Sequence, residues 1–274
     1  MSDEARRTTL KLVQYFILTV VAAVFVLPIL HVMYNSLLPR HLIGSWAAPA
    51  NWTLDNYREL MTKYPVGGWY QNTILSTVVV VLGNSIIPPM AGYALAKLRF
   101  PGRQAAFICV LLSMMVPFQL IIIPQYIMLA QFKLVNTLYA ITVPFLSQTM
   151  FIVISRQFFL GIPAELEEAA RIDGLGRMGT YFRIVLPISG VLIATILIFN
   201  FAGTWNSYLI PSTYINTTSK YTLVVGLQTV NNAHFQRENL TLAGVFLLSF
   251  PVMFFFAAMQ KYFVQGIAST GLKG

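Results

Sequence analysis

Residues 156–183, RQFFLGIPAELEEAARIDGLGRMGTYFR, form a charged segment between two long uncharged runs. The run before it, residues 134–155, reads LVNTLYAITVPFLSQTMFIVIS, and the run after it, residues 184–219, reads IVLPISGVLIATILIFNFAGTWNSYLIPSTYINTTS. A helix needs about 20 mainly apolar residues to cross the core of a bilayer, and each run is long enough. This part of the sequence therefore predicts two membrane spans joined by a polar connection.

The same alternation continues through the whole chain of 274 residues, of which 57% are hydrophobic and only 10% are charged. A soluble domain has roughly a quarter of its residues charged. Four further runs without Asp, Glu, Lys or Arg cover residues 12–39, 64–96, 104–132 and 239–260. We therefore expect an all-α integral membrane protein that forms a single domain over residues 1–274. Its six transmembrane helices are expected at about 12–37, 72–96, 105–129, 136–156, 187–211 and 240–263.

The basic residues indicate which side of the membrane the termini occupy. Six spans place both termini on one side, and 12 of the 18 Lys and Arg residues then lie on that side. Because basic residues are enriched in cytoplasmic loops, we expect cytoplasmic termini. The net charge of +9 is then explained by flanks that lie near anionic lipid. No basic patch is interleaved with stacking aromatic residues, so no nucleic-acid partner is expected.

Enzyme chemistry finds little support in the sequence. The three histidines, His31, His41 and His234, are isolated, and neither H-E-x-x-H nor G-x-S-x-G occurs. The phosphate-binding pattern G-x-x-x-x-G-K-[ST] is also absent. We therefore expect no catalytic residue, metal site or cofactor in this chain.

The charged segment itself predicts a short helix of about residues 164–173. Pro163 suits its start, Glu165, Glu167 and Glu168 complement the positive helix N-terminus, and Glu167 can pair with Arg171 at i,i+4. Gly174 is expected to end the helix in a left-handed conformation. Leu166, Ala169 and Ala170 are placed on one face, where a partner could approach closely.

The segment contains Glu168-Ala169-Ala170, followed by Gly174, Ile184 and Leu186-Pro187. This pattern resembles the EAA loop of binding-protein-dependent ABC importer permeases. Along essentially its whole length, the chain is similar to the carbohydrate-type branch of this family, and in particular to the smaller permease subunit of maltose transporters. The stretches that carry this wider resemblance are residues 91–103 (AGYALAKLRFPGR), 124–126, 135–140, 203–209 (GTWNSYL), 260–266 and 272–274.

The resemblance implies a multi-pass permease in a bacterial or archaeal cell (inner) membrane, in which residues 161–186 form a cytoplasmic coupling loop between spans four and five. The implied partners are a second permease subunit, two ATPase subunits that carry ATP and Mg, an extracytoplasmic solute-binding protein, membrane lipid and a small-molecule solute. ATP hydrolysis would take place on the ATPase subunits. The residues implied in ATPase coupling are Glu168, Ala169, Ala170, Arg171, Asp173 and Gly174.

Polar residues inside apolar runs are candidates for the translocation path, because every hydrogen-bonding group there needs a partner or water. The candidates are Asn72, Gln119, Asn200, Thr204, Trp205, Asn206 and Tyr208, with Ser76, Asn84 and Gln148 as further polar positions. Amides beside aromatic rings suit a neutral, sugar-like solute. Each of these groups could instead only bridge two helices. A permease for another small solute such as a glycerophosphate derivative, an integral-membrane enzyme and a membrane scaffold are the alternatives.

The expected topology can be tested by labelling single cysteines at Ser2, Gly44 and Gly174 in a variant that lacks Cys109. Positions 2 and 174 should react with a membrane-impermeant thiol reagent only from the cytoplasmic side, and position 44 only from the other side. Labelling of position 174 from the outer face would contradict the topology.

Overall fold

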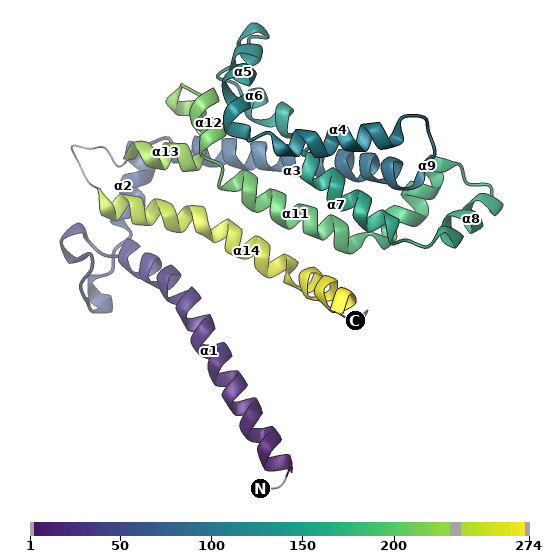
Figure 1. Cartoon of the computed structure of the whole chain (residues 1–274). Coiled ribbons are helices and arrows are strands. Elements are labelled where there is room, and N and C mark those ends of the chain that lie inside the picture. The colour runs from purple at the N-terminus through teal and green to yellow at the C-terminus, as the bar shows by residue number, and fades with distance from the viewer. Residues whose placement is uncertain (1–2, 231–236, 272–274) are drawn as a thin grey trace. The chain divides into compact units, whose positions relative to one another are not determined.

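The computed structural model describes residues 3–230 and 237–271, so expectations for His234 and for residues 272–274 lie outside it. Every regular element in these two ranges is helical, which confirms the all-α class (Figure 1). The elements named below are α1 (Asp3–Ser36), α2 (Asp55–Lys63), α3 (Val66–Lys97), α4 (Arg103–Met115), α5 (Phe118–Gln131), α6 (Leu138–Thr142), α7 (Thr149–Leu160), α8 (Ala164–Ile172), α9 (Arg177–Thr180), the π-helical turn η4 (Tyr181–Val185), α10 (Leu186–Ile188), α11 (Gly190–Trp205), α12 (Leu209–Tyr214), α13 (Leu223–Val230) and α14 (Glu238–Gly271).

Four helical segments are long and apolar enough to cross a membrane, namely Leu10–Ser36, Val66–Lys97, Leu138–Leu160 and Glu238–Gln260. Two bent helix pairs pass the same test when each pair is taken together: Arg103–Met115 with Phe118–Gln131, and Arg177–Ile188 with Gly190–Trp205. The described chain thus has four to six candidate spans. The broken pairs fall where the third and fifth spans were expected.

The span expected over about residues 105–129 is not one straight helix in the structure. The chain bends by 100° between α4 and α5. Val116, which precedes Pro117, is extended with φ −84° and ψ 115°, because the proline ring disfavours the helical conformation of the residue before it. A similar bend of 75° separates Arg177–Ile188 from α11 at Ser189, so the helix of the fifth run begins at Gly190 rather than at 187.

Contacts divide the chain into two units, which are described separately: Met1–Val66 with Leu227–Phe250, and Gly67–Gly226 with Pro251–Gly274. In the first unit, the buried amide of Asn56 in α2 donates to the carbonyls of Ser36 and Leu38, both at 2.8 Å. Its oxygen accepts from Asn239 in α14 at 2.8 Å. One side chain thereby joins the end of α1, the helix α2 and the start of α14.

A charged cluster lies beside it in the same unit. Glu59 in α2 accepts from Lys63 at 2.6 Å and also pairs with Arg237. The hydrogen bond from Lys63, followed by the charges of Lys63 and Arg237, holds the pKa of Glu59 below its usual value. The first expected loop between spans is therefore an ordered segment built around α2.

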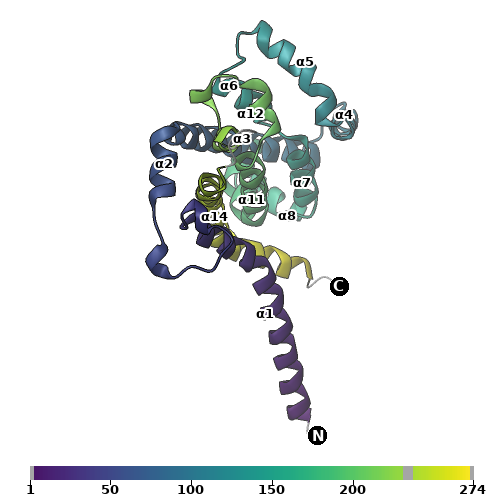
Figure 2. The ribbon, with the colours of Figure 1, turned by 90° about the vertical axis from the view of Figure 1, so that its left-hand side faces the viewer.

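In the second unit, α3, α4, α7 and α11 run side by side, with α5, α6 and α12 at one end and α8 and α9 at the other (Figures 1 and 2). A buried cluster near the α8 end includes Tyr93, Phe159, Tyr181 and Leu192 from α3, α7, η4 and α11. The ring centroids of Tyr93 and Tyr181 are 5.1 Å apart. This aromatic contact ties the turn that follows α9 to the helices of the bundle.

The opposite end of this unit is held by hydrogen bonds between loops. Asn136 has φ +62° and its side chain accepts from the backbone N–H groups of Asn216 and Thr217. The Asn136 side-chain amide also donates to the Thr217 hydroxyl at 2.7 Å, and the Lys220 ammonium group donates to the backbone carbonyl of Asn136. Asn tolerates the left-handed conformation better than most residues, which explains its presence at this turn.

Helix α3 lies close to the backbone of α7 at Gly92. A Cβ placed on Gly92 would lie 2.5 Å from the Cβ of Ser155, 2.7 Å from the backbone nitrogen of Arg156 and 3.0 Å from the carbonyl of Ile152. Two of these contacts are to backbone atoms, which cannot move without displacing the helix. Small residues at such crossings let membrane helices pack backbone to backbone.

We expect Gly92→Leu to prevent the packing of α3 on α7. Overpacking costs about 1–3 kcal/mol where side chains can shift, and more where backbone must move. The purified variant should aggregate or be degraded, as measured by size-exclusion chromatography in detergent. Gly67→Leu in the same helix is the matched control, because a Cβ there meets nothing within 4 Å. Equal behaviour of the two variants would contradict this account of the crossing.

Candidate functional site

The short helix α8 spans Ala164–Ile172, close to the expected 164–173. It buries Glu167 and Ala170, whereas Glu168, Ala169, Arg171 and Asp173 are exposed. Leu166 and Ile172 are also exposed, by 42% and 87%. The two alanines expected on one face therefore separate: Ala170 packs inward and Ala169 faces outward.

Gly174 ends α8 as the sequence predicts. Its φ is +79°, its N–H donates to the carbonyl of Arg171 at 3.0 Å, and the N–H of Leu175 donates to Ala170 at 2.9 Å. These two bonds form a Schellman motif, in which the left-handed residue is normally glycine. The expected conformation of Gly174 is confirmed, and it fixes the direction in which the chain leaves α8.

The carboxylate of Glu167 is paired with a residue far away in the sequence. Lys97, the last residue of α3, lies 3.4 Å from it, and both side chains are largely buried, with 13% and 10% exposed. Lys97 also donates to the carbonyl of Ile162 at 2.5 Å. No ion pair joins Glu167 to Arg171 among the described residues, so the expected i,i+4 pair is replaced by this longer-range one.

Sequence reasoning did not assign a role to Lys97. The available signal was its position, because it is the first charge after the uncharged run 64–96 and lies in the stretch 91–103. It lines a pocket of about 350 Å³ with Arg99, Arg171, Arg177 and Glu168. The pocket gathers four cationic side chains and two carboxylates at the α8 end of the bundle.

The expected path residues on α11 fall on two sides of that helix. Trp205 is 3% exposed, stacks on Phe201 with ring centroids 5.4 Å apart, and meets Tyr70 of α3 edge-on at 5.7 Å. Phe201 in turn stacks on Phe255 of α14 at 4.0 Å. Trp205 is thus packed among aromatic rings, and with Tyr70, Phe201 and Phe255 it also lines an apolar pocket of about 260 Å³.

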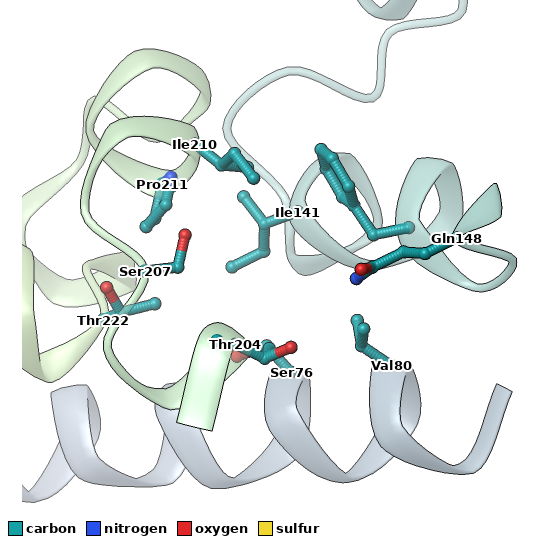
Figure 3. Close-up of a pocket in the computed structure, with 11 residues that line it drawn as sticks. Ser76, Val80, Ile141, Gln148, Thr204, Ser207, Ile210, Pro211 and Thr222 are labelled. Atoms are coloured by element: carbon teal, nitrogen blue, oxygen red, sulfur yellow. The ribbon is translucent and has the colours of Figure 1, made fainter. Parts of the chain in front are cut away.

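Thr204 lies on the other side of α11 and lines a separate pocket of about 180 Å³ (Figure 3). Its hydroxyl donates to the side-chain oxygen of Asn200 at 3.1 Å, and the buried Asn200 Nδ2 has no hydrogen-bond partner within the described residues. The remaining pocket wall is formed by Ser76, Val80, Ile141, Phe145, Gln148, Gly203, Ser207, Ile210, Pro211 and Thr222. The sequence indicated Ser76 and Gln148 as polar positions inside apolar runs, but it gave no prediction for Ser207 or Thr222.

The other four path candidates do not line this pocket. Asn72 donates to the carbonyls of Ser219 and Tyr221, both at 3.1 Å, and so fastens a loop to α3. Asn206 donates to Ala202 of its own helix. Gln119, Asn206 and Tyr208 are exposed. The structure therefore brings together only Asn200 and Thr204 from the expected set.

Comparison with known proteins gives a consistent result. A family model described as "Binding-protein-dependent transport system inner membrane component" matches residues 89–269. The arabinooligosaccharides transport system permease protein AraQ of Halalkalibacterium halodurans is 32% identical over 260 residues, which cover 93% of each chain. The maltodextrin transport system permease protein MdxG of Bacillus subtilis is 28% identical over 282 residues, with full coverage of both chains.

A solved structure shares the fold. It is a chain of a bacterial ABC transporter involved in the import of the acidic polysaccharide alginate, with a TM-score of 0.80 and 23% identity. The match covers 96% of this chain and 99% of that chain. The arrangement of helices described above is thus one that a solved membrane transporter also adopts.

The Lys97–Glu167 pair leads to a prediction about stability. Lys97→Met would leave a buried carboxylate without its cation, which costs about 3 kcal/mol, and would lower the midpoint of thermal unfolding in detergent by roughly 6 °C or more. Lys63→Met is the matched control, since its pair with Glu59 is exposed and worth at most about 1 kcal/mol. Similar shifts of the unfolding midpoint in the two variants would show that burial of the Lys97–Glu167 pair adds nothing to stability.

Proposed function

The chain belongs to the family of binding-protein-dependent transport system inner membrane components, and on that premise we propose that it is the permease subunit of an ATP-driven ABC importer. With a second permease it would form the translocation path for a sugar or sugar-like neutral solute delivered by a binding protein. The family confirms the resemblance found in the sequence. It also confirms that the chain is a transport component and not an enzyme.

The proposal of a sugar rests on the near full-length match to permeases named for oligosaccharides. AraQ is named for arabinooligosaccharides and MdxG for maltodextrin, and both matches extend over almost the whole chain. These names favour a sugar over a glycerophosphate derivative, because the similarity includes the helices that would border the path. The pocket in Figure 3 is lined by hydroxyl groups, the Gln148 amide and apolar side chains, and this lining also suits a neutral solute.

The proposed assembly contains this single permease domain, a second permease, two ATPase subunits that bind ATP and Mg, and an extracytoplasmic binding protein. The chain would lie in the cell (inner) membrane, surrounded by lipid. Counting each bent helix pair as one span gives six spans, with both termini and α8 on the cytoplasmic side. This arrangement agrees with the bias of basic residues in the sequence.

The surface of α8 supports docking to an ATPase. Exposed Glu168 and Arg171 can make charge-assisted contacts, and the exposed Ile172 supplies apolar contact area beside them. Ala169 beside them allows close approach, and Asp173 and Gly174 set the exit of the chain. The buried Glu167, held by Lys97, would join this docking surface to α3.

We expect Glu168→Lys and Gly174→Val to weaken ATPase association and to abolish ATP-dependent uptake. Loss of a charge-assisted contact costs about 1.5–3 kcal/mol, which weakens docking roughly tenfold or more. Valine at position 174 would be strained at φ +79°. The measurements are co-purification of the ATPase and sugar uptake into proteoliposomes.

Two control variants separate docking from general damage. Gly176→Val changes a glycine two residues further on that has negative φ and open space around it. Glu238→Lys reverses an exposed charge on α14. Both should retain uptake. Normal uptake and ATPase stimulation in Glu168→Lys and Gly174→Val would contradict the coupling role, and absence of ATP-dependent sugar uptake by the unaltered complex would contradict the proposed function.

A further inference from the structure

One positive charge lies within a candidate membrane span and has no carboxylate partner in the described part of the chain. Arg156 belongs to α7 and to the span Leu138–Leu160, and it lies one helical turn before α7 ends. The ion pairs among the described residues use Lys63, Lys97 and Arg237 as their cations. An arginine near the end of a span reaches toward the interface, where a group of opposite charge stabilises it. The countercharge of Arg156 must therefore come from outside the described residues.

An aromatic ring of the neighbouring helix holds this guanidinium group. The Cζ atom of Arg156 lies 3.8 Å from the ring centroid of Phe107 in α4, and α4 and α7 run side by side (Figures 1 and 2). The N–H donors of a guanidinium lie in its plane, so a ring against one face does not use them. Arg156 is partly exposed although its Nε is buried. The donors on its two terminal nitrogens are therefore the ones that a ligand can reach.

Further positive charge gathers at the same end of α4. Arg103 is the first residue of α4 and lies four residues before Phe107, so the two share one side of the helix. One terminal nitrogen of Arg103 donates to the carbonyl of Leu98 at 3.2 Å, and the side chain is partly exposed. Arg99, in the connection before α4, is exposed. This end of α4 thus attracts anions.

The surface that continues from these cations along α4 is apolar. No side chain of α4 is buried. Leu111, one turn beyond Phe107 on the same side, is 39% exposed, and Ile108 and Leu112 beside it are 45% and 57% exposed. An anionic phospholipid has the matching arrangement, because its charged phosphate adjoins long acyl chains. A soluble anion would use the cations alone.

We propose that Arg156, stacked on Phe107, binds the phosphate of an anionic phospholipid together with Arg103. The planar donors of Arg156 suit two oxygens of one phosphate, and the acyl chains lie along the exposed side of α4. The inference uses the proposed arrangement for one point, that this end of α4 and α7 is cytoplasmic. The cytoplasmic leaflet is the one in which anionic lipid attracts basic residues. The site is separate from the docking surface of α8 and from the pocket of Figure 3.

Thermal unfolding of the full chain in detergent, purified with any subunits that remain bound, measures this site. Dioleoyl phosphatidylglycerol should raise the unfolding midpoint by roughly 5–10 °C near saturation, because a ligand that binds the folded state stabilises it. Dioleoyl phosphatidylcholine has the same acyl chains without net charge, and glycerol 1-phosphate has the anionic group without the chains. Each of these two probes should raise the midpoint by less than half as much.

Arg156→Gln removes the charge and should abolish most of the rise caused by phosphatidylglycerol. Phe107→Leu keeps the charge and an apolar side chain but removes the ring, so it should reduce the rise, and it serves as the test if Arg156→Gln does not fold. Arg183→Gln is the matched control, because Arg183 is exposed on η4 and its loss changes the net charge equally. It should keep the full rise. Each variant is compared with itself without lipid, which separates lipid binding from the variant's own stability.

Three results would overturn the proposal. An equal rise in Arg183→Gln and in the site variants would show that the lipid acts elsewhere or on net charge. An equal rise with glycerol 1-phosphate and with phosphatidylglycerol would show a site for a soluble anion. The third result is no rise in the unaltered chain, and loss of a bound membrane subunit from Arg156→Gln would then identify a carboxylate of that subunit as the countercharge. Uptake tests the proposed function separately, so the two can fail independently.

Discussion

The structure depends on one constraint: backbone groups that leave a regular helix among apolar surroundings must be hydrogen-bonded within the protein. Asn84 meets this requirement at the interruption between η3 (Val143–Phe145) and α7, where it pairs one carbonyl and one N–H. Thr73 accepts from Leu223, and Trp69 donates to the carbonyl of Thr218 at 2.7 Å. All three side chains belong to α3. That helix therefore provides the hydrogen bonds that allow the neighbouring segments to be irregular and so to enclose a pocket.

Two neighbouring surfaces of α11 illustrate how one short segment combines packing and polar function. Phe201 and Trp205, one helical turn apart, join an aromatic stack with Tyr70 and Phe255. Thr204, next to Trp205 in the chain, faces the pocket instead. The aromatic side holds α11 against α3 and α14, so the polar side can stay open. The stretch GTWNSYL at 203–209 thus has mixed composition because its residues belong to both surfaces.

The sequence predicted features that depend on local chemistry and missed those that depend on distant partners. The length of α8, its acidic first turn and the left-handed Gly174 all follow from neighbouring residues, and they were predicted correctly. The partner of Glu167 was not, because Lys97 lies on another helix. Proline was an ambiguous signal: Pro117 accompanies the bend between α4 and α5, whereas Pro88 and Pro89 lie inside the uninterrupted helix α3. A charge-free run shows where membrane segments are, but does not show which proline breaks them. Thr222 was not predicted as a candidate because it lies outside the charge-free runs in which the spans were expected.

The two candidate sites are linked by one uninterrupted helix, α3. Lys97 ends α3 beside α8, and Ser76 of the same helix lines the pocket. The 21 residues that separate them span about 32 Å along a helix axis, which is of the order of the thickness of the bilayer core. Gly92 holds α3 against α7 between these two points, so the helix cannot bend away from the bundle there without losing backbone packing. On the proposed function, a displacement of α8 by an ATPase acts on the Lys97–Glu167 pair and reaches the pocket through α3. The coupling then requires no chain of flexible contacts, because a single packed helix carries both the ion pair and the pocket wall.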